Sequence, residues 1–151
     1  MIPPSPWVVR HAQSIPARGK VLDLACGSGR HARFLAGLGY PVLAVDRDAR
    51  ALAGVSTIKG IMTRQLDLEG EEWPLAGQVF DGIVVTNYLW RPRLPDVLAL
   101  LAPSGVLIYE TFMVGNAAYG KPSNPAFLLL AGELRQLAAA GRRVRVLTLP
   151  G

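Results

Sequence analysis

Two carboxylates and two glycines in this sequence are spaced as the contacts of a nucleoside ligand would be. Asp23 lies within an apolar run that is followed by Gly27 and Gly29. Asp46 ends the next apolar run, nineteen residues after Gly27. Glycine has no Cβ, so the backbone can approach a ligand closely, and a carboxylate at a neighbouring strand end can accept hydrogen bonds from both ribose hydroxyls. The spacing therefore predicts a nucleoside-binding loop.

The position of Asp23 distinguishes between two kinds of nucleoside ligand. Residues 27–32 fit the G-x-G-x-x-A dinucleotide fingerprint, which is a weak signal by itself. A dinucleotide-binding strand is typically apolar up to its first glycine, and a carboxylate at Asp23 would crowd a pyrophosphate. That carboxylate would instead suit an ammonium group, held directly or through water. S-adenosylmethionine carries an ammonium, a ribose and an adenine but no phosphate, so it fits the pattern.

Short apolar runs alternate with helical patterns along the chain. Strands are expected at 21–25, 41–46, 83–86 and 106–109, with weaker ones at 61–67 and 144–149. Helices are expected after a Ser5 cap with Pro6 in the first turn, from Arg30, and over 49–53, 94–101 and 130–138. The alternation predicts one α/β domain over residues 1–151, Rossmann-like and doubly wound. We expect a mostly parallel sheet of about six strands, helices on both faces, and a ligand site at the carboxyl ends of the strands.

Composition narrows the class of protein further. Half of the 151 residues are apolar and 18% are charged, which is typical of a folded domain and excludes a disordered chain. One cysteine, Cys26, allows neither an intrachain disulfide nor a cysteine-based zinc site, and His11 and His31 are far apart, so we expect no metal.

The apolar tracts and the charge pattern also bear on partners. The longest apolar tracts fall far short of the ~20 residues that span a membrane, and no charged-then-apolar leader opens the chain. We therefore expect a soluble cytoplasmic protein without a membrane partner. Thirteen arginines raise the net charge to +5, but only Arg142, Arg143 and Arg145 form a cluster, so nucleic acid is not expected as a substrate.

These motifs resemble those of the class I S-adenosylmethionine-dependent methyltransferases. D-L-A-C-G-S-G at 23–29, followed by a helix and by A-V-D at 44–46, is similar to the first two motifs of that family. Further similar segments lie at 65–69, 80–87 and 103–108. Within the class, 109–112 and 120–125 resemble the small bacterial methyltransferases of the tellurite-resistance type.

The resemblance implies S-adenosylmethionine as the cofactor and a small molecule as the methyl acceptor. The implied cofactor-binding residues lie at four strand ends, and Asp67 would lie near the adenine amino group. They are Asp23, Ala25, Gly27, Ser28, Gly29, Asp46, Arg47, Asp67, Leu68, Thr86 and Asn87.

A catalytic base is optional in this reaction, because direct displacement at a sulfonium expels a neutral leaving group and alignment alone can supply ~7–11 kcal/mol. If the acceptor must lose a proton, the candidate bases are His31, Tyr88, Tyr109 and Glu110. Residues 86–90 lack the prolines of the N-P-P-Y motif found in amine-methylating nucleic-acid enzymes. Two other functions stay open: binding of S-adenosylmethionine without turnover, and an NAD(P)-dependent oxidoreductase.

The C-terminus raises a question about the sheet. The resembling family usually has a seventh, antiparallel strand between the fifth and sixth, but residues 148–151 come where the sixth strand should finish. We therefore expect the seventh strand to be missing, which would leave the apolar edge at 106–109 open to aggregation. The sixth strand could dock on this edge directly, a second chain could cover it in a homodimer, or the sequence could be a shortened form of a longer protein.

Overall fold

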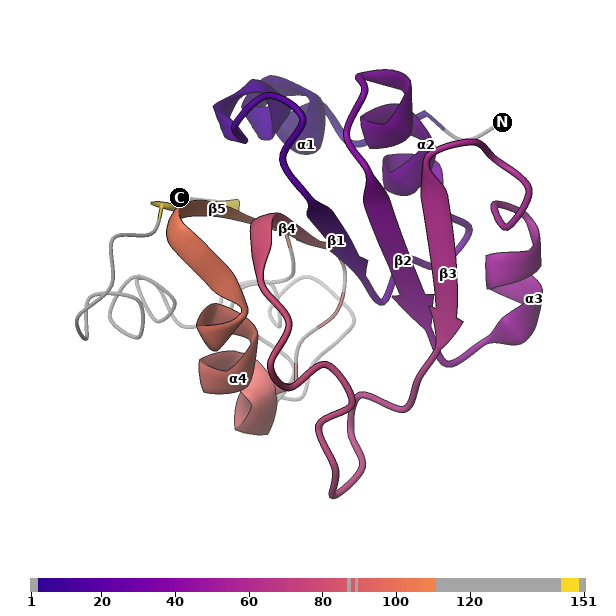
Figure 1. The fold of residues 1–151 in the computed structure, drawn as a ribbon, viewed down its shortest axis with the longest axis vertical. Coiled ribbons are helices and arrows are strands. Elements are labelled where there is room, and N and C mark those ends of the chain that lie inside the picture. Colours follow the sequence, from indigo (N-terminus) through magenta and orange to yellow (C-terminus); the bar gives the residue numbers. More distant parts are fainter. Residues whose placement is uncertain (1–2, 87, 89, 111–144, 150–151) are drawn as a thin grey trace, which may run out of the picture.

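The computed structural model describes residues 3–86, 88, 90–110 and 145–149. The strands form a single sheet in the order β3-β2-β1-β4-β5-β6, and every neighbouring pair is parallel (Figure 1). The strands are β1 Val21–Leu24, β2 Val42–Asp46, β3 Ile61–Gln65, β4 Phe80–Thr86, β5 Leu101–Glu110 and β6 Arg145–Leu149. The predicted α/β architecture with a parallel sheet is confirmed.

Helices pack against both faces of this sheet, as predicted. They are α1 Pro6–His11, α2 Arg30–Gly37, α3 Ala49–Ala53 and α4 Leu94–Ala99, with short 3-10 turns η1 Ala12–Ser14 and η2 Arg91–Arg93. One apolar cluster joins α1, α2 and α3 to one face of the sheet, and a second joins α4 to the other. Among the described residues, no helix has both the length and the apolar character needed to cross a membrane.

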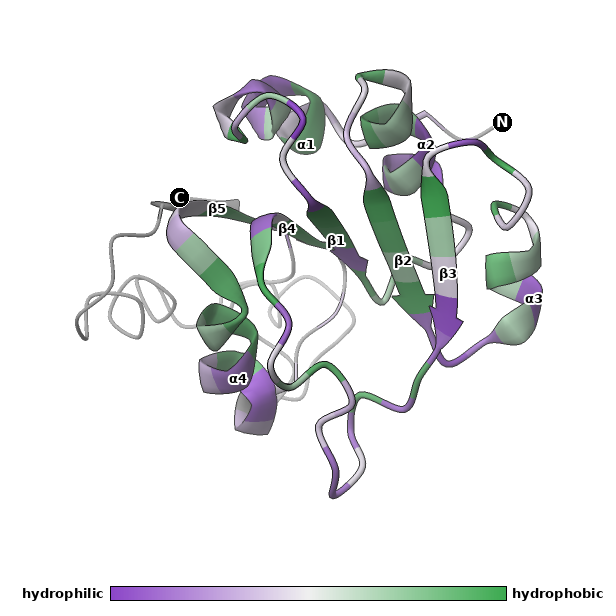
Figure 2. Ribbon diagram, viewed as in Figure 1, coloured by the Kyte–Doolittle hydropathy of each residue, from purple (hydrophilic) through white to green (hydrophobic). Residues whose placement is uncertain are grey.

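The central strand β1 is buried at all four positions because helices cover both of its faces. Leu22 and Leu24 belong to the α4 cluster, whereas Val21 belongs to the cluster of α1, α2 and α3. Side chains alternate along a strand, so Asp23 lies on the same face as Val21. Figure 2 shows β1 and β2 as largely hydrophobic, which is the pattern expected of strands covered on both sides.

Two boundaries near the C-terminal side of the sheet differ from prediction. The expected helix over 94–101 ends at Ala99, and β5 begins at Leu101, five residues before the expected start at Val106. Leu101 pairs with Phe80 of β4, and the register shifts before Val106 pairs with Gly82. The turn residues between Leu101 and Val106 thus form an irregularity within the strand.

The edge of β5 is covered by β6, which runs parallel to it and pairs directly over five positions. This confirms the first of the three arrangements considered for that edge. The predicted helix over 130–138 lies outside the described residues.

The N-terminal segment is held against the sheet by packing and by hydrogen bonds. The predicted cap is confirmed: the Ser5 side chain accepts a hydrogen bond from the amide of Trp7, at the start of α1. The Tyr40 hydroxyl shares its one proton between the carbonyl oxygens of Ala12 (3.1 Å) and Ile15 (2.9 Å). Ile15 packs so closely on Gly82 that an added Cβ there would lie 2.7 Å from Ile15 Cδ1. The segment is therefore part of the core.

We predict that Gly82→Ala destabilises the fold by about 1–3 kcal/mol, because the new methyl group would overlap Ile15. Urea denaturation measures the change in unfolding free energy. Gly37→Ala is the matched control, because a Cβ at the exposed end of α2 meets no atom within 4 Å. The control should be neutral or stabilising by up to about 1 kcal/mol. Equal stability of the two variants would contradict the packing argument.

Candidate functional site

The loop between β1 and α2 contains three residues in the left-handed backbone region. They are Ala25 (φ 55°), Gly27 (φ 55°) and Gly29 (φ 80°). The two glycines have different surroundings. A Cβ on Gly27 would meet no atom within 4 Å, whereas one on Gly29 would lie 2.5 Å from Val55 Cγ1. Gly27 therefore borders open space where a ligand could lie, and Gly29 allows the start of α2 to pack against Val55.

Asp46 lies beside this loop and holds it in place. Its Oδ2 accepts a hydrogen bond from the Gly27 amide, and its Oδ1 accepts one from the Asp48 amide, both at 2.9 Å. A carboxylate offers about four lone-pair positions, so acceptor capacity remains on both oxygens. Asp48 caps α3 by accepting a hydrogen bond from the Arg50 amide (2.9 Å), so Asp46 is not the cap of this helix. The structure thus brings together the predicted loop and the predicted ribose carboxylate.

Asp23 is a buried carboxylate whose hydrogen-bonding capacity is unused. Its side chain is 1% exposed, and neither oxygen has a hydrogen-bond partner among the described residues. Burial raises the pKa of Asp23 to about 7 and the nearby Asp46 carboxylate adds to the shift, while Arg30 and the Ala32 backbone amide, which is near the carboxyl but does not meet hydrogen-bond geometry, oppose it. A buried, unpaired carboxylate is costly unless a cation or donor reaches it. The site therefore fits a ligand that carries an ammonium group.

The segments after β3 and β4 contribute further predicted residues. Asp67 Oδ1 accepts a hydrogen bond from the Glu69 amide (2.9 Å), and Leu68 is buried in the α4 cluster. The Tyr88 hydroxyl donates to Glu69 Oε2 (3.1 Å). Burial and the Glu69 carboxylate raise the pKa of Tyr88 well above its usual value. Tyr88 therefore remains protonated at neutral pH.

Two other candidate bases are enclosed in the fold. His31 is 1% exposed, its Nε2 accepts a hydrogen bond from the Ser5 amide (3.0 Å), and its Nδ1 lies 3.4 Å from Thr86 Oγ1. Burial, reinforced by Arg30, lowers the pKa of His31 to about 4. Tyr109 is 1% exposed and its hydroxyl donates to the Tyr88 carbonyl. These contacts favour structural roles for both side chains.

The remaining predicted site residues are placed less specifically. Ser28 and Arg47 are exposed near the loop, and Glu110 is partly exposed at the end of β5. Asn87 lies outside the described residues. Within the described part of the chain, no group of three or more histidine, cysteine, aspartate or glutamate side chains could hold a metal ion.

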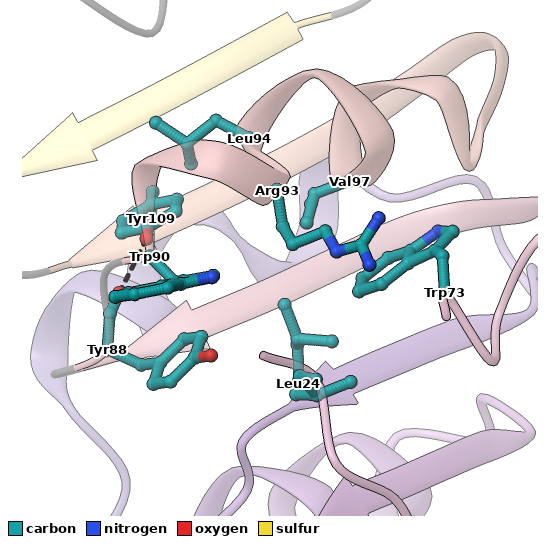
Figure 3. Close-up of a pocket in the computed structure, with 9 residues that line it drawn as sticks. Leu24, Trp73, Tyr88, Trp90, Arg93, Leu94, Val97 and Tyr109 are labelled. Carbon is teal, nitrogen blue, oxygen red and sulfur yellow. Dashed lines mark hydrogen bonds between the residues drawn. The ribbon is translucent and has the colours of Figure 1, made fainter. Parts of the chain in front are cut away.

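A pocket rich in aromatic side chains lies at the carboxyl ends of β1, β4 and β5 (Figure 3). It is lined by Leu24, Leu68, Trp73, Tyr88, Trp90, Arg93, Leu94, Val97 and Tyr109. Trp73, Trp90 and Arg93 are not among the site residues predicted from the sequence. The only local signal was the presence of two tryptophans on either side of β4, at positions 73 and 90.

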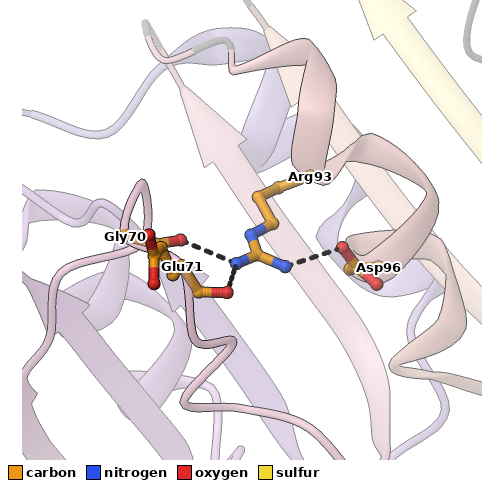
Figure 4. Close-up of polar contacts among 4 residues, drawn as sticks. All are labelled: Gly70, Glu71, Arg93 and Asp96. Carbon is orange, nitrogen blue, oxygen red and sulfur yellow. Dashed lines mark hydrogen bonds and ion pairs between the residues drawn. The ribbon is translucent and has the colours of Figure 1, made fainter.

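Arg93 holds one wall of this pocket together (Figure 4). Its guanidinium donates to the carbonyls of Gly70 (2.7 Å) and Glu71 (2.9 Å) and forms an ion pair with Asp96 (3.2 Å). The same group lies over the Trp73 ring, 5.2 Å from its centroid. Arg93 therefore ties the segment after β3 to α4, and its charge is balanced within the fold.

Comparison with known proteins identifies relatives of this chain. Residues 6–99 match the family model described as tellurite resistance protein TehB. The chain is 31% identical over 117 residues to the putative methyltransferase YqeM of Bacillus subtilis, a match that covers 69% of this chain and 47% of that protein. It is also 31% identical over 113 residues to the uncharacterized methyltransferase YodH of the same organism, covering 70% and 46%.

The fold comparison agrees with the sequence comparison. The crystal structure of TehB from Haemophilus influenzae matches with a TM-score of 0.67 at 26% identity, covering 86% of this chain and 48% of that one. The chain thus spans about half the length of these relatives. It belongs to the TehB family and has the class I S-adenosylmethionine-dependent methyltransferase fold.

Proposed function

We propose that this protein binds S-adenosylmethionine and transfers its methyl group to a small-molecule acceptor. The observation that carries the proposal is the unpartnered, buried carboxylate of Asp23 beside the open edge of the glycine loop. An ammonium group would satisfy Asp23 and remove the cost of its burial. A pyrophosphate would instead place negative charge next to it, which argues against a dinucleotide.

The remaining parts of the cofactor also have partners of suitable chemistry. Asp46 keeps acceptor capacity for ribose hydroxyls, and Gly27 leaves room for the ligand. Leu68 lines the aromatic pocket, whose mainly aromatic and aliphatic walls suit the adenine ring. Asp67 Oδ2 would accept from the adenine amino group, because the Glu69 amide engages Oδ1.

The bound sulfonium supplies an activated methyl group, so the protein mainly aligns the reactants. The acceptor would lie at the ends of β4 and β5, where Thr86 and Glu110 are register neighbours. Glu110 is the candidate base best placed to meet an acceptor, since it is partly exposed while His31 and Tyr109 are buried.

Calorimetric titration with S-adenosylmethionine, S-adenosylhomocysteine and NADH tests the cofactor. We expect binding of the first two and none of NADH. Transfer of an isotopically labelled methyl group to a panel of small amines, thiols and oxyanions then tests turnover. Binding of NADH alone would overturn the proposal, and cofactor binding without transfer to any acceptor would support a binding protein without turnover.

Asp46→Ala should weaken S-adenosylmethionine binding by about 1.5–3 kcal/mol, because charge-assisted hydrogen bonds to the ribose would be lost. Calorimetry measures the affinity. Asp48→Ala is the matched control, since it removes the cap of the neighbouring helix α3 without removing the proposed ribose contact. Unchanged affinity in Asp46→Ala, or an equal loss in both variants, would contradict the ribose role.

Gly27→Val should abolish cofactor binding, because its side chain would occupy the open space beside the loop. Gly77→Val is the control for backbone strain. Gly77 also has a positive φ (84°) and open surroundings, but it lies in the segment between β3 and β4. We expect similar losses of thermal stability in both variants and loss of binding only in Gly27→Val. A Gly27→Val protein that binds normally would rule out the loop assignment.

Asp23→Asn should stabilise the ligand-free protein at pH 8 and not at pH 4. The raised pKa means that folded Asp23 keeps its proton to about pH 7, whereas the unfolded residue loses it near pH 4. Burial of Asp23 therefore costs the wild-type protein no charge-related stability below about pH 4, where the residue is protonated in both states. The folded state becomes progressively less stable as the pH rises towards 7. Removing the charge should recover roughly 2–4 kcal/mol at pH 8.

Urea denaturation of both proteins across this pH range measures the difference, and calorimetry should show weaker S-adenosylmethionine binding by the variant. A pH-independent stability difference would contradict the assignment of this titration to Asp23.

A further inference from the structure

His31 connects three elements that meet at the edge of the proposed cofactor site. It lies in the first turn of α2, directly after the glycine loop. Its Nε2 accepts a hydrogen bond from the Ser5 amide at the start of the N-terminal helix (3.0 Å). Its Nδ1 lies 3.4 Å from the Thr86 hydroxyl at the end of β4. The ring is thus a bridge between the N-terminal segment and the central sheet.

The chemistry of these partners determines where the imidazole proton lies. A backbone amide can only donate, so Nε2 must present its lone pair to Ser5. The ring is 1% exposed, and burial lowers its pKa to about 4, so it is neutral at pH 7. A neutral imidazole carries one proton, which must therefore be on Nδ1. Nδ1–H then donates to Thr86 Oγ1.

This arrangement determines the role of the Thr86 hydroxyl. Because Oγ1 accepts from His31, the hydroxyl proton is directed to a different partner. Thr86 follows Val85, which pairs with Leu24 at the end of β1, so the hydroxyl lies next to the strand that carries Asp23. The amino-acid end of the cofactor has an ammonium, which only donates, and a carboxylate, which only accepts. Asp23 suits the ammonium, and the Thr86 hydroxyl suits the carboxylate.

We infer that His31 is a positioning residue that orients the Thr86 hydroxyl as a hydrogen-bond donor to the carboxylate of S-adenosylmethionine. The inference rests on the proposed function. It assigns the two charged groups of one ligand to different strands: the ammonium to β1 and the carboxylate to β4. Removing the bridge should therefore weaken binding only of ligands that keep the carboxylate.

The test compares S-adenosylmethionine with decarboxylated S-adenosylmethionine, which retains the ammonium, ribose and adenine. Thr86→Val removes the hydroxyl with little change of shape, and His31→Leu removes both ring contacts. Each variant should bind S-adenosylmethionine about tenfold more weakly and the decarboxylated ligand within about twofold of wild type. Thr86→Ser and His31→Gln keep the donor and acceptor groups, so both should recover most of the affinity.

Tyr40→Phe is the matched control for loosening of the N-terminal segment. It removes the hydroxyl that holds Ala12 and Ile15 but does not contact Thr86. It should lower stability without changing the ratio of the two affinities. Nitrogen-15 NMR of the ligand-free wild-type protein provides an independent readout, and we expect His31 as the neutral Nδ1–H tautomer from pH 5.5 to 8.

The outcomes separate this inference from the proposed function. A wild-type protein that binds neither ligand overturns both. A wild-type protein that binds both ligands, with variants that lose equal affinity for the two or lose none, overturns the role of His31 alone. An Nε2–H tautomer would also overturn it, since Nδ1 could then not donate to Thr86.

Discussion

The reversal of strand order on either side of β1 is the constraint on which the site depends. Leu24 pairs with Val45 of β2 on one side and with Val85 of β4 on the other, both in parallel. The chain after β1 therefore emerges between two strand ends, and the crossover connections leave in opposite directions. Asp46 and Thr86, the residues that follow these two partners, consequently lie on opposite sides of the same loop.

The buried carboxylate of Asp23 in β1 lowers the stability of the ligand-free protein. Asp23 is held in an apolar layer with no hydrogen-bond partner among the described residues, although neighbouring positions in β1 are occupied by leucine and valine. An apolar residue there would pack without a desolvation penalty. The protein thus keeps a destabilising group where the proposed ligand would neutralise it, so part of the binding free energy would come from relieving this penalty.

Local chemistry made much of the site predictable from the sequence. The Ser5 cap is confirmed, and the structure places the Asp46 carboxylate against the Gly27 amide, because a cap follows from local sequence and the ends of neighbouring parallel strands meet at one edge of the sheet. The start of β5 differs from the expected position because Pro103, Ser104 and Gly105 are turn-forming residues that give no local strand signal. Only pairing with Phe80, more than twenty residues earlier, shows that the strand begins before them. The pocket contributed by Trp90 and Arg93 was missed because it forms only when α4 packs against the segment after β3.

The contacts of His31 illustrate the same limit and explain the docking of the N-terminal segment. Its partners are 26 and 55 residues away, so no local pattern could have paired them. From the sequence alone, the position of His31 directly after the glycine loop suggests a candidate base. Its burial instead gives it two directional contacts of opposite sense, one accepted and one donated. A leucine of similar size would fill the space, but it could neither accept a hydrogen bond from the Ser5 amide nor donate one to the Thr86 hydroxyl. This explains why a polar ring occupies an otherwise apolar position.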